Sequence, residues 1–239
     1  MVPPQASPGQ AWLEDLERAG WSQLADRLIH GICHSLNGRI TALSSVLYFL
    51  ESPDQDISSM ASLLEPEIDH LQEAEQFLRL LLHDPSGPVV LVPGEVLPVL
   101  ARTLSLQRGL EETHVEVQIP PETPGVRVER ALFVRSMLLL LSRWAEMAAA
   151  RGERGVGLAA RGEEGGLNLF LEVPKAETRR QETDLSRKPV LPFGSLPEDC
   201  EKGVEAALRK EGIQLEREEQ DRGGRRGDGI TLRLRFPPP

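Results

Sequence analysis

Residues 21–51 read WSQLADRLIHGICHSLNGRITALSSVLYFLE, and this stretch decides the fold. Its apolar residues recur every three or four positions, which is the spacing of one face of an α-helix. The last five alternate steps of four and three, a pattern typical of a helix that packs lengthwise against other helices. At 1.5 Å per residue the stretch predicts a rod about 46 Å long. The apolar positions are Leu24, Leu28, Ile32, Leu36, Ile40, Leu43, Leu47 and Leu50.

A second helical pattern spans residues 56–83, after a break at Ser52, Pro53 and Asp54. Both patterns carry a long apolar stripe, so we expect the two helices to form an antiparallel hairpin. One hairpin cannot cover stripes of this length, and we therefore expect two chains to pair as a dimeric four-helix bundle. The inward residues of the second helix are expected to be Ile57, Met60, Leu64, Ile68, Leu71, Leu78 and Leu81.

The segment at residues 84–88, Asp-Pro-Ser-Gly-Pro, is the clearest linker in the chain, and the apolar period changes after it. Strand and helix patterns then follow to the C-terminus. We predict a flexible tail and short helix at 1–20, the helical hairpin at 21–84 and an α/β sandwich at 85–239. The expected fold class is α+β.

Composition and charge narrow the functional classes. The net charge of −10 gives no general attraction to nucleic acids or anionic membranes. The longest apolar run, residues 137–141, is far shorter than the roughly 20 residues that cross a bilayer. Cys33 and Cys200 lie far apart, with no CxxC pair and no secretory signal. We therefore expect a cytoplasmic protein with no nucleic-acid or membrane partner.

The ten residues from His34 to Leu43, HSLNGRITAL, resemble the phospho-acceptor segment of two-component histidine kinases. Three positions depart from that family's pattern: Ser35 replaces an acidic residue, Gly38 replaces Thr or Asn, and Arg39 replaces a proline. The residues that fit the pattern are His34, Leu36, Asn37, Ile40, Thr41, Ala42 and Leu43.

The resemblance implies that His34 is a phospho-acceptor, and helix geometry agrees with that role. His34 and Leu36 lie about 200° apart around a helix, so a core-facing Leu36 places His34 on the outer surface. Asn37, Gly38 and Thr41 share this face and would border a docking surface for a receiver domain. The alternative is that His34 is an ordinary surface histidine. His30 and Cys33 stand nearby, but no carboxylate completes a metal site, so no metal is expected.

Residues 85–239 resemble the ATP-binding module of the same family in the order of their elements and in the closing hairpin at 211–237. The positions that would carry the nucleotide chemistry do not match. Arg143 stands where the family has an asparagine that serves Mg²⁺–ATP, and residues 174–178 lack the Asp-x-Gly-x-Gly pattern. Glu198 and Asp199 stand where a glycine-rich segment would hold phosphates. We therefore expect a degenerate ATPase-like domain with no cofactor.

These features favour a histidine phosphotransferase of a phosphorelay, similar to the dimeric bacterial phosphotransferases that kept the kinase architecture and lost ATP binding. In that hypothesis His34 exchanges phosphoryl groups with response-regulator receiver domains. One alternative is a non-catalytic dimeric scaffold or pseudokinase that binds a partner kinase or a receiver. A second is a divergent sensor histidine kinase that uses ATP and Mg²⁺, with residues 174–197 as the ATP lid. Whether the chain is an enzyme stays open at this point.

Overall fold

The structure is a computed structural model, and it describes residues 11–50, 57–81, 87–107, 109–110, 112–153, 155–163, 166–173, 194–219 and 230–237. Three features named above lie wholly or mostly outside the described residues. They are the tail at 1–10, the linker at 84–88 and the polar segment at 174–197, of which residues 87–88 and 194–197 are described.

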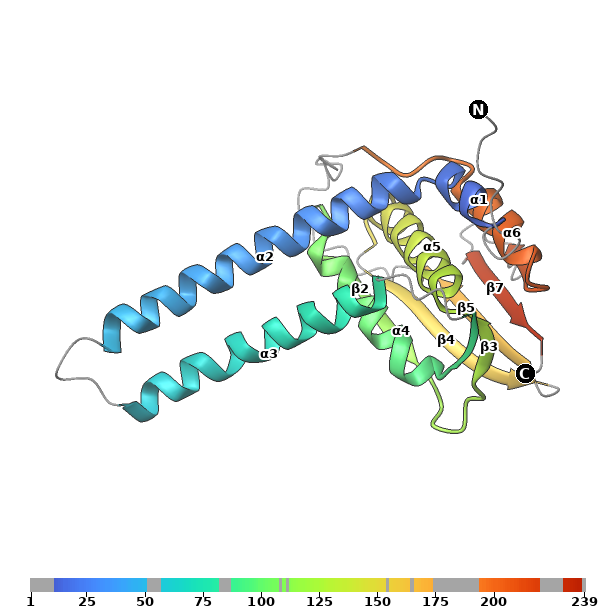
Figure 1. The fold of residues 1–239 in the computed structure, drawn as a ribbon. Helices are drawn as coiled ribbons and strands as arrows, with labels where there is room; N and C mark the ends of the chain where they lie inside the picture. Colours follow the sequence, from blue (N-terminus) through green and yellow to red (C-terminus); the bar gives the residue numbers. More distant parts are fainter. Residues whose placement is uncertain are drawn as a thin grey trace, which may run out of the picture.

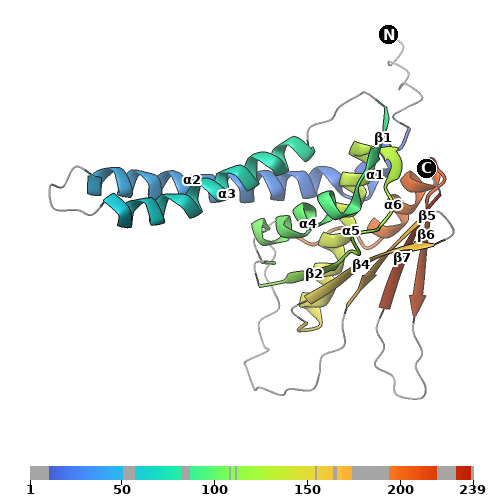
Figure 2. The same ribbon diagram turned by 90° about the horizontal axis from the view of Figure 1, so that it is seen from below.

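The first part of the chain forms a long helical hairpin. A short helix α1 (Leu13–Arg18) leads through Gly20, whose φ is +97°, into α2 (Trp21–Leu50). Helix α3 (Ile57–Leu81) runs back beside α2, and Pro66 lies within it. Figures 1 and 2 show both helices projecting together from the rest of the molecule. The predicted hairpin is confirmed.

The second part is a two-layer α/β body. Strands β1 (Pro88–Leu91) and β3 (Val126–Glu129) form a small antiparallel pair. The main sheet has the order β2-β4-β5-β7-β6, in which only the β2–β4 pair is parallel among the described strands. Its strands are β2 (His114–Gln118), β4 (Gly155–Glu163), β5 (Gly166–Glu172), β6 (Gln214–Glu219) and β7 (Ile230–Phe236).

The helices of the body lie on one face of the main sheet, as Figure 2 shows. They are α4 (Pro93–Arg102), continued by the 3-10 helix η2 (Thr103–Leu106), then α5 (Arg130–Ala150) and α6 (Cys200–Arg209). Alternate residues of β7 explain this layering, because Leu232 and Leu234 are buried while Arg235 is exposed. The predicted α+β class, a helical hairpin followed by an α/β sandwich, is confirmed.

One continuous core joins the base of the hairpin to the body. Helix α5 is buried on nearly every side, because the sheet covers one side and α1 and α2 lie over the other. Trp12 donates a hydrogen bond from Nε1 to Glu129 Oε2 at 2.9 Å. The guanidinium of Arg135 lies over the rings of Trp12 and Trp21, 5.7 and 5.0 Å from their centres, and its burial lowers the pKa of Arg135.

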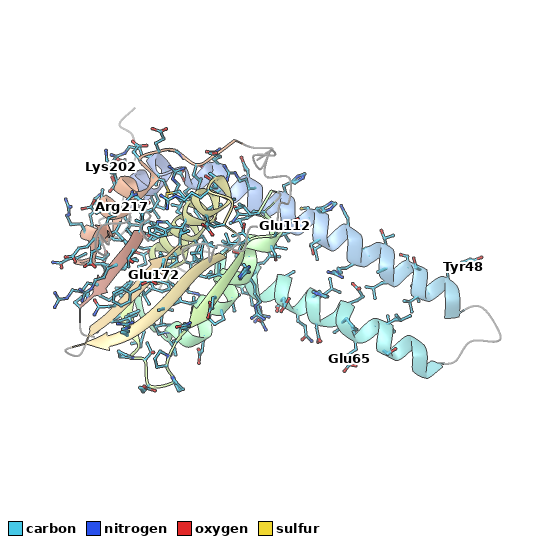
Figure 3. The ribbon with its side chains drawn as sticks, turned by 180° about the vertical axis from the view of Figure 1, so that it is seen from behind. Tyr48, Glu65, Glu112, Glu172, Lys202 and Arg217 are labelled. Atoms are coloured by element: carbon cyan, nitrogen blue, oxygen red, sulfur yellow. The ribbon has the colours of Figure 1, made fainter. Side chains whose placement is uncertain are left out.

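The apolar stripe of α2 is therefore divided into a part that the core buries and a part that is exposed on the projecting hairpin. Leu24, Leu28 and Ile32 are buried in the common core, whereas Ile40 and Leu47 are 58% and 64% exposed. Figure 3 shows Tyr48 at the far end of α2, pointing away from the hairpin.

In the single chain, the side of α3 that is most buried differs in part from the side that was expected to face inward in a dimeric bundle. Its buried residues are Phe77 and Leu80, while Ile68 and Leu78, which were expected to face inward, are exposed. The physical reason is that α3 packs against α4 and α5 of the body as well as against α2. Among the side chains that the structure describes on α2 and α3, the large apolar ones that remain exposed are Ile29, Ile40, Leu47, Tyr48, Leu63, Ile68 and Leu78.

Candidate functional site

His34 lies in the middle of α2 and is exposed to solvent. Asn37, Gly38 and Thr41 are exposed as well, and they lie within about 60° of His34 around the helix. Thr41 donates from Oγ1 to the carbonyl of Asn37 at 2.9 Å, which keeps its hydroxyl close to the helix backbone. A Cβ built on Gly38 would meet no atom within 4 Å, so this face is open.

Helix α2 has three distinct faces at the level of His34. Counting 100° per residue, Arg39 lies about 140° to one side of His34 and Ile40 about 120° to the other. Arg39 faces α3 and forms an ion pair with Glu67. Ile40 belongs to the uncovered apolar stripe. His34 lies between these two directions, on neither the Arg39–Glu67 contact with α3 nor the exposed apolar stripe, and its side chain is exposed.

A cavity of about 650 Å³ opens beside His34, and we call it the histidine cleft. It is bounded by α2, α3 and the α4–η2 segment. Gly31 permits this close packing, because a Cβ at that position would lie 1.8 Å from the carbonyl oxygen of Leu106. The polar and charged residues that line the cleft from α2, α3, α4 and η2 are His30, His34, Ser35, Arg39, His70, Glu73, Gln76, Arg102, Thr103 and Ser105.

Two arginines enter the histidine cleft from different elements. Nη1 of Arg39 lies 3.1 Å from both carboxylate oxygens of Glu67 on α3. Nη1 of Arg102 on α4 lies 2.9 Å from Oε1 of Glu73, also on α3. Each arginine thus comes from one element and is held by a glutamate of another. These contacts place both guanidiniums at the walls of the cleft.

The sequence did not reveal this cleft. His70 and Arg102 lie 36 and 68 positions after His34, and nothing in the local pattern links them to it. In the sequence His70 belongs to no motif, whereas the structure places it in the same cleft as His34. A signal for this proximity would require the register of α3 against α2, which one sequence does not contain.

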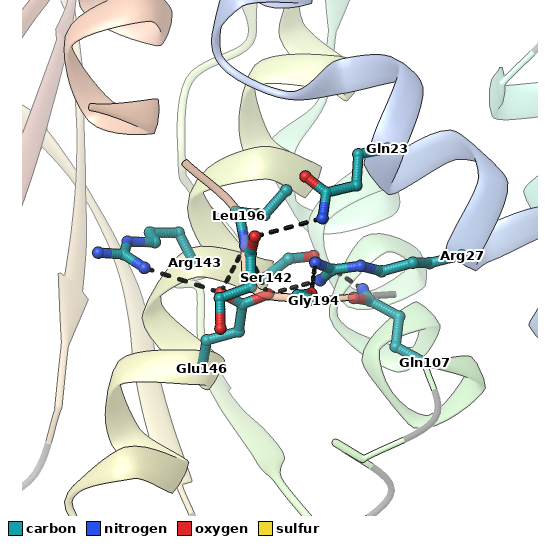
Figure 4. Close-up of polar contacts among 9 residues, drawn as sticks. Gln23, Arg27, Gln107, Ser142, Arg143, Glu146, Gly194 and Leu196 are labelled. Carbon is teal, nitrogen blue, oxygen red and sulfur yellow. Dashed lines mark hydrogen bonds and ion pairs between the residues drawn. The ribbon is translucent and has the colours of Figure 1, made fainter. Parts of the chain in front are cut away.

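A second polar cluster joins the base of the hairpin to the body, and Figure 4 shows it in close-up. The side chains of Arg27 and Glu146 are only 5% and 4% exposed, and Arg27 Nη1 lies 2.5 Å from Glu146 Oε1. Nη2 of Arg27 donates to the carbonyl of Gly194. The backbone N–H of Leu196 donates to Glu146 Oε2 at 3.0 Å. Gln23 adds a bond from Nε2 to the carbonyl of Ser195 at 3.2 Å.

This Arg27–Glu146 network involves positions where the resemblance would place nucleotide chemistry. Nη1 of Arg143 lies 3.8 Å from Oε2 of Glu146, so its charge is directed to an internal carboxylate. The N–H of Leu196, just before α6, is already bonded to the same carboxylate. Glu198 and Asp199 are exposed at the start of α6. Residues 174–178 lie outside the described residues.

The cysteines and the ligand-forming side chains offer little for a metal. Within the described ranges, no group of three or more His, Cys, Asp or Glu residues is arranged to hold a metal ion. Cys33 is exposed and Cys200 is buried, and neither forms a disulfide. Burial raises the pKa of the Cys200 thiol to about 12, so this cysteine is an uncharged packing residue at neutral pH. None of the helices in the described residues has the length and apolar character that a membrane crossing requires.

Comparison with known proteins returns histidine kinase cores and a phosphotransferase. The chain is 15% identical to a bacterial phosphotransferase, over 88% of this chain and 95% of that one, with a TM-score of 0.43. It is 13% identical to histidine kinase AdeS from Acinetobacter baumannii, over 85% and 96%, with a TM-score of 0.39. It is 20% identical to a mycobacterial sensor histidine kinase, MprB, over 63% of this chain and 97% of that one, with a TM-score of 0.43. No family model and no curated protein matches the chain. The resemblance inferred from the sequence is to the same group of proteins.

Proposed function

We propose that this chain is a histidine phosphotransferase, in which His34 exchanges phosphoryl groups with response-regulator receiver domains. The observation that carries the proposal is the position of His34. Its side chain is exposed, away from the apolar stripe of α2 and beside the open surface at Gly38. A receiver needs such access, because its phosphorylated aspartate must come within bonding distance of the imidazole.

The proposed step needs little from the chain beyond position. The lone pair of an unprotonated imidazole nitrogen of His34 forms the N–P bond. The P–O bond to the receiver's aspartate breaks, and its electron pair returns to the aspartate as a carboxylate. Phosphoryl transfer of this kind depends on in-line alignment and on neutralising charge, and the receiver supplies Mg²⁺. Transfer to a second receiver reverses the same step.

The uncovered apolar side chains of the hairpin support a homodimer as the working form. Seven large apolar residues lie exposed among the described side chains of α2 and α3, and on α2 three of them, Ile29, Ile40 and Leu47, lie within about 20° of one another around the helix. A contiguous apolar surface of this kind usually marks an interface. Pairing two hairpins over it would make a four-helix bundle and leave His34 on the outside of each pair.

Light scattering tests the dimer. The parent chain is expected to have twice the 26.4 kDa chain mass at micromolar concentration. Leu47→Asp should shift the mass toward that of a monomer, because it places an unpaired charge in the interface while changing no buried contact of the single chain. Ser45→Asp is the matched control, since Ser45 is exposed about 20° from His34 around the helix and should leave the dimer intact. A monomeric parent would exclude the bundle.

We also propose that the chain does not bind ATP. The Arg27–Glu146 network supports this, because it directs Arg143 and the N–H of Leu196 to an internal carboxylate at positions where the resemblance would place nucleotide chemistry. Calorimetry with millimolar Mg²⁺–ATP is expected to give no saturable heat, with an ATP-binding histidine kinase core as the positive control. Saturable binding in the tens of micromolar would instead support the divergent-kinase alternative.

A further inference from the structure

We infer that Arg39 and Arg102 hold the phosphoryl group on His34 from inside the histidine cleft, an inference that rests on the proposed function. The two arginines would bind the phosphoryl oxygens while a receiver approaches from the open face of α2. The sequence gives no hint of this role, since Arg39 stands where the resemblance has a proline and Arg102 belongs to another part of the chain.

The cleft has the space and the donors that a phosphoryl group requires. His34 forms part of its wall, so a group on the ring can lie within the cavity of about 650 Å³. A phosphoryl group adds nearly two negative charges at neutral pH and three strong acceptor oxygens. Guanidinium is the side-chain group whose planar fork best matches such oxygens. Arg39 and Arg102 both line this cavity, and no lysine does so among the described residues.

Both arginines are paired with a glutamate of α3 and are still accessible. Their side chains are 31% and 59% exposed. In the described part of the chain, each guanidinium is engaged by its glutamate through Nη1, which leaves the Nη2 edge for another acceptor. Glu67, which is only 16% exposed and is contacted through both oxygens, thus orients the guanidinium of Arg39 before the phosphoryl group arrives, and less side-chain entropy is lost when it binds. A free arginine on a solvated helix would lack this advantage.

The two arginines also reach the cleft from different parts of the chain. Arg39 follows His34 by five residues, roughly 7.5 Å along the axis of α2 toward the tip of the hairpin. Arg102 comes from the end of α4, on the body side of the cleft. The phosphoryl group would therefore be bound by one cation from the hairpin and one from the body. The binding site would require both parts of the chain to be packed together.

The test uses the full-length chain and two phosphoryl donors. One donor is phosphoramidate, whose P–N bond breaks and releases ammonia as the N–P bond to His34 forms. The other is a phosphorylated receiver. Arg39→Gln and Arg102→Gln are each expected to slow the appearance of acid-labile phosphate on His34 about tenfold, since each removes a charge-assisted hydrogen bond. The double variant should slow it about a hundredfold if the two act independently.

Two further variants separate phosphoryl binding from a structural role. Arg39→Lys keeps the charge and loses the fork, so it should recover part of the rate lost in Arg39→Gln. Arg79→Gln is the matched control, because Arg79 pairs with Glu75 on α3 outside the cleft and should change nothing. If Arg39→Gln fails to fold, Arg39→Lys and Arg102→Gln still decide the outcome.

The two donors distinguish failure of this inference from failure of the proposed function. If both donors label His34 equally fast in the parent and in the Gln variants, the inference is wrong and the proposed function stands. If phosphoramidate labels His34 in an arginine-dependent way but no receiver does, the inference stands and the proposed function fails. If neither donor labels His34 in the parent, both are wrong.

Discussion

Replacing Glu146 with alanine is expected to lower the free energy of unfolding by about 3–5 kcal/mol, because it leaves a buried guanidinium without its counter-charge. Arg27 and Glu146 are both almost fully buried, and their nearest nitrogen and oxygen are 2.5 Å apart. The substitution also removes the acceptor of the Leu196 N–H, a second buried polar group. Urea unfolding followed by circular dichroism, at fixed protein concentration, measures the loss.

Two controls show whether the loss comes from the unpaired charge. Glu75→Ala breaks the exposed Arg79–Glu75 pair on α3 and should cost less than about 0.5 kcal/mol. The double variant Arg27→Met with Glu146→Leu removes both charges, and it should recover much of the stability lost in Glu146→Ala. If Glu146→Ala unfolds within about 1 kcal/mol of the parent, the Arg27–Glu146 network does not hold the hairpin to the body.

This network bears on the site because it sets the position of α2. Arg27 precedes His34 by seven residues, about 10.5 Å along the same helix. Fixing Arg27 to α5 and to residues 194–196 therefore fixes where His34 stands relative to α4 and η2. The close contact at Gly31, between these two positions, depends on the same placement. The shape of the histidine cleft thus depends on the contacts at the base of the hairpin.

The sequence predicted the parts of the fold that repeat locally. The alternating steps of four and three in residues 21–51 indicated the long helix, because a helix face recurs within a single turn. The outward position of His34 followed from its spacing to Leu36 in the same way. The sequence did not predict which part of the apolar stripe is buried. Leu28 and Leu47 occupy equivalent places in the pattern, although Leu28 is buried in the core and Leu47 is exposed.

Contacts between distant segments determine the features of the fold and of the cleft that the sequence pattern did not predict. Phe77 and Leu78 are neighbours, and either fits an apolar helical stripe; packing of α3 against the body as well as α2 buries the first and exposes the second. The strand order β2-β4-β5-β7-β6 and the convergence of His34, His70 and Arg102 likewise depend on contacts between distant segments. No local spacing encodes such contacts, so the cleft could be found only in the folded chain.

Replacing His34 with alanine is expected to abolish phosphate uptake from phosphorylated receivers while leaving the fold intact. Only the imidazole of His34 forms the N–P bond in the proposed step, so no residual transfer should remain. An exposed helical position tolerates alanine well, and the free energy of unfolding should change by no more than about 0.5 kcal/mol. Acid-labile, base-stable phosphate on the chain measures uptake, and circular dichroism with light scattering verifies folding and mass.

His30→Ala and His70→Ala are the matched controls, because both histidines line the same cleft as His34 and are exposed. Each should reduce transfer only modestly, since neither forms the bond to phosphorus. Equal uptake by His34→Ala and the parent would place the phosphate elsewhere. If the parent takes up no phosphate from any receiver of the source cell, the phosphotransferase hypothesis fails. The remaining hypothesis is then a dimeric scaffold that binds a receiver or a kinase through the same open face. The departures at Ser35 and Gly38 suit that scaffold as well as a relay, so the chemistry at His34 is what separates the two.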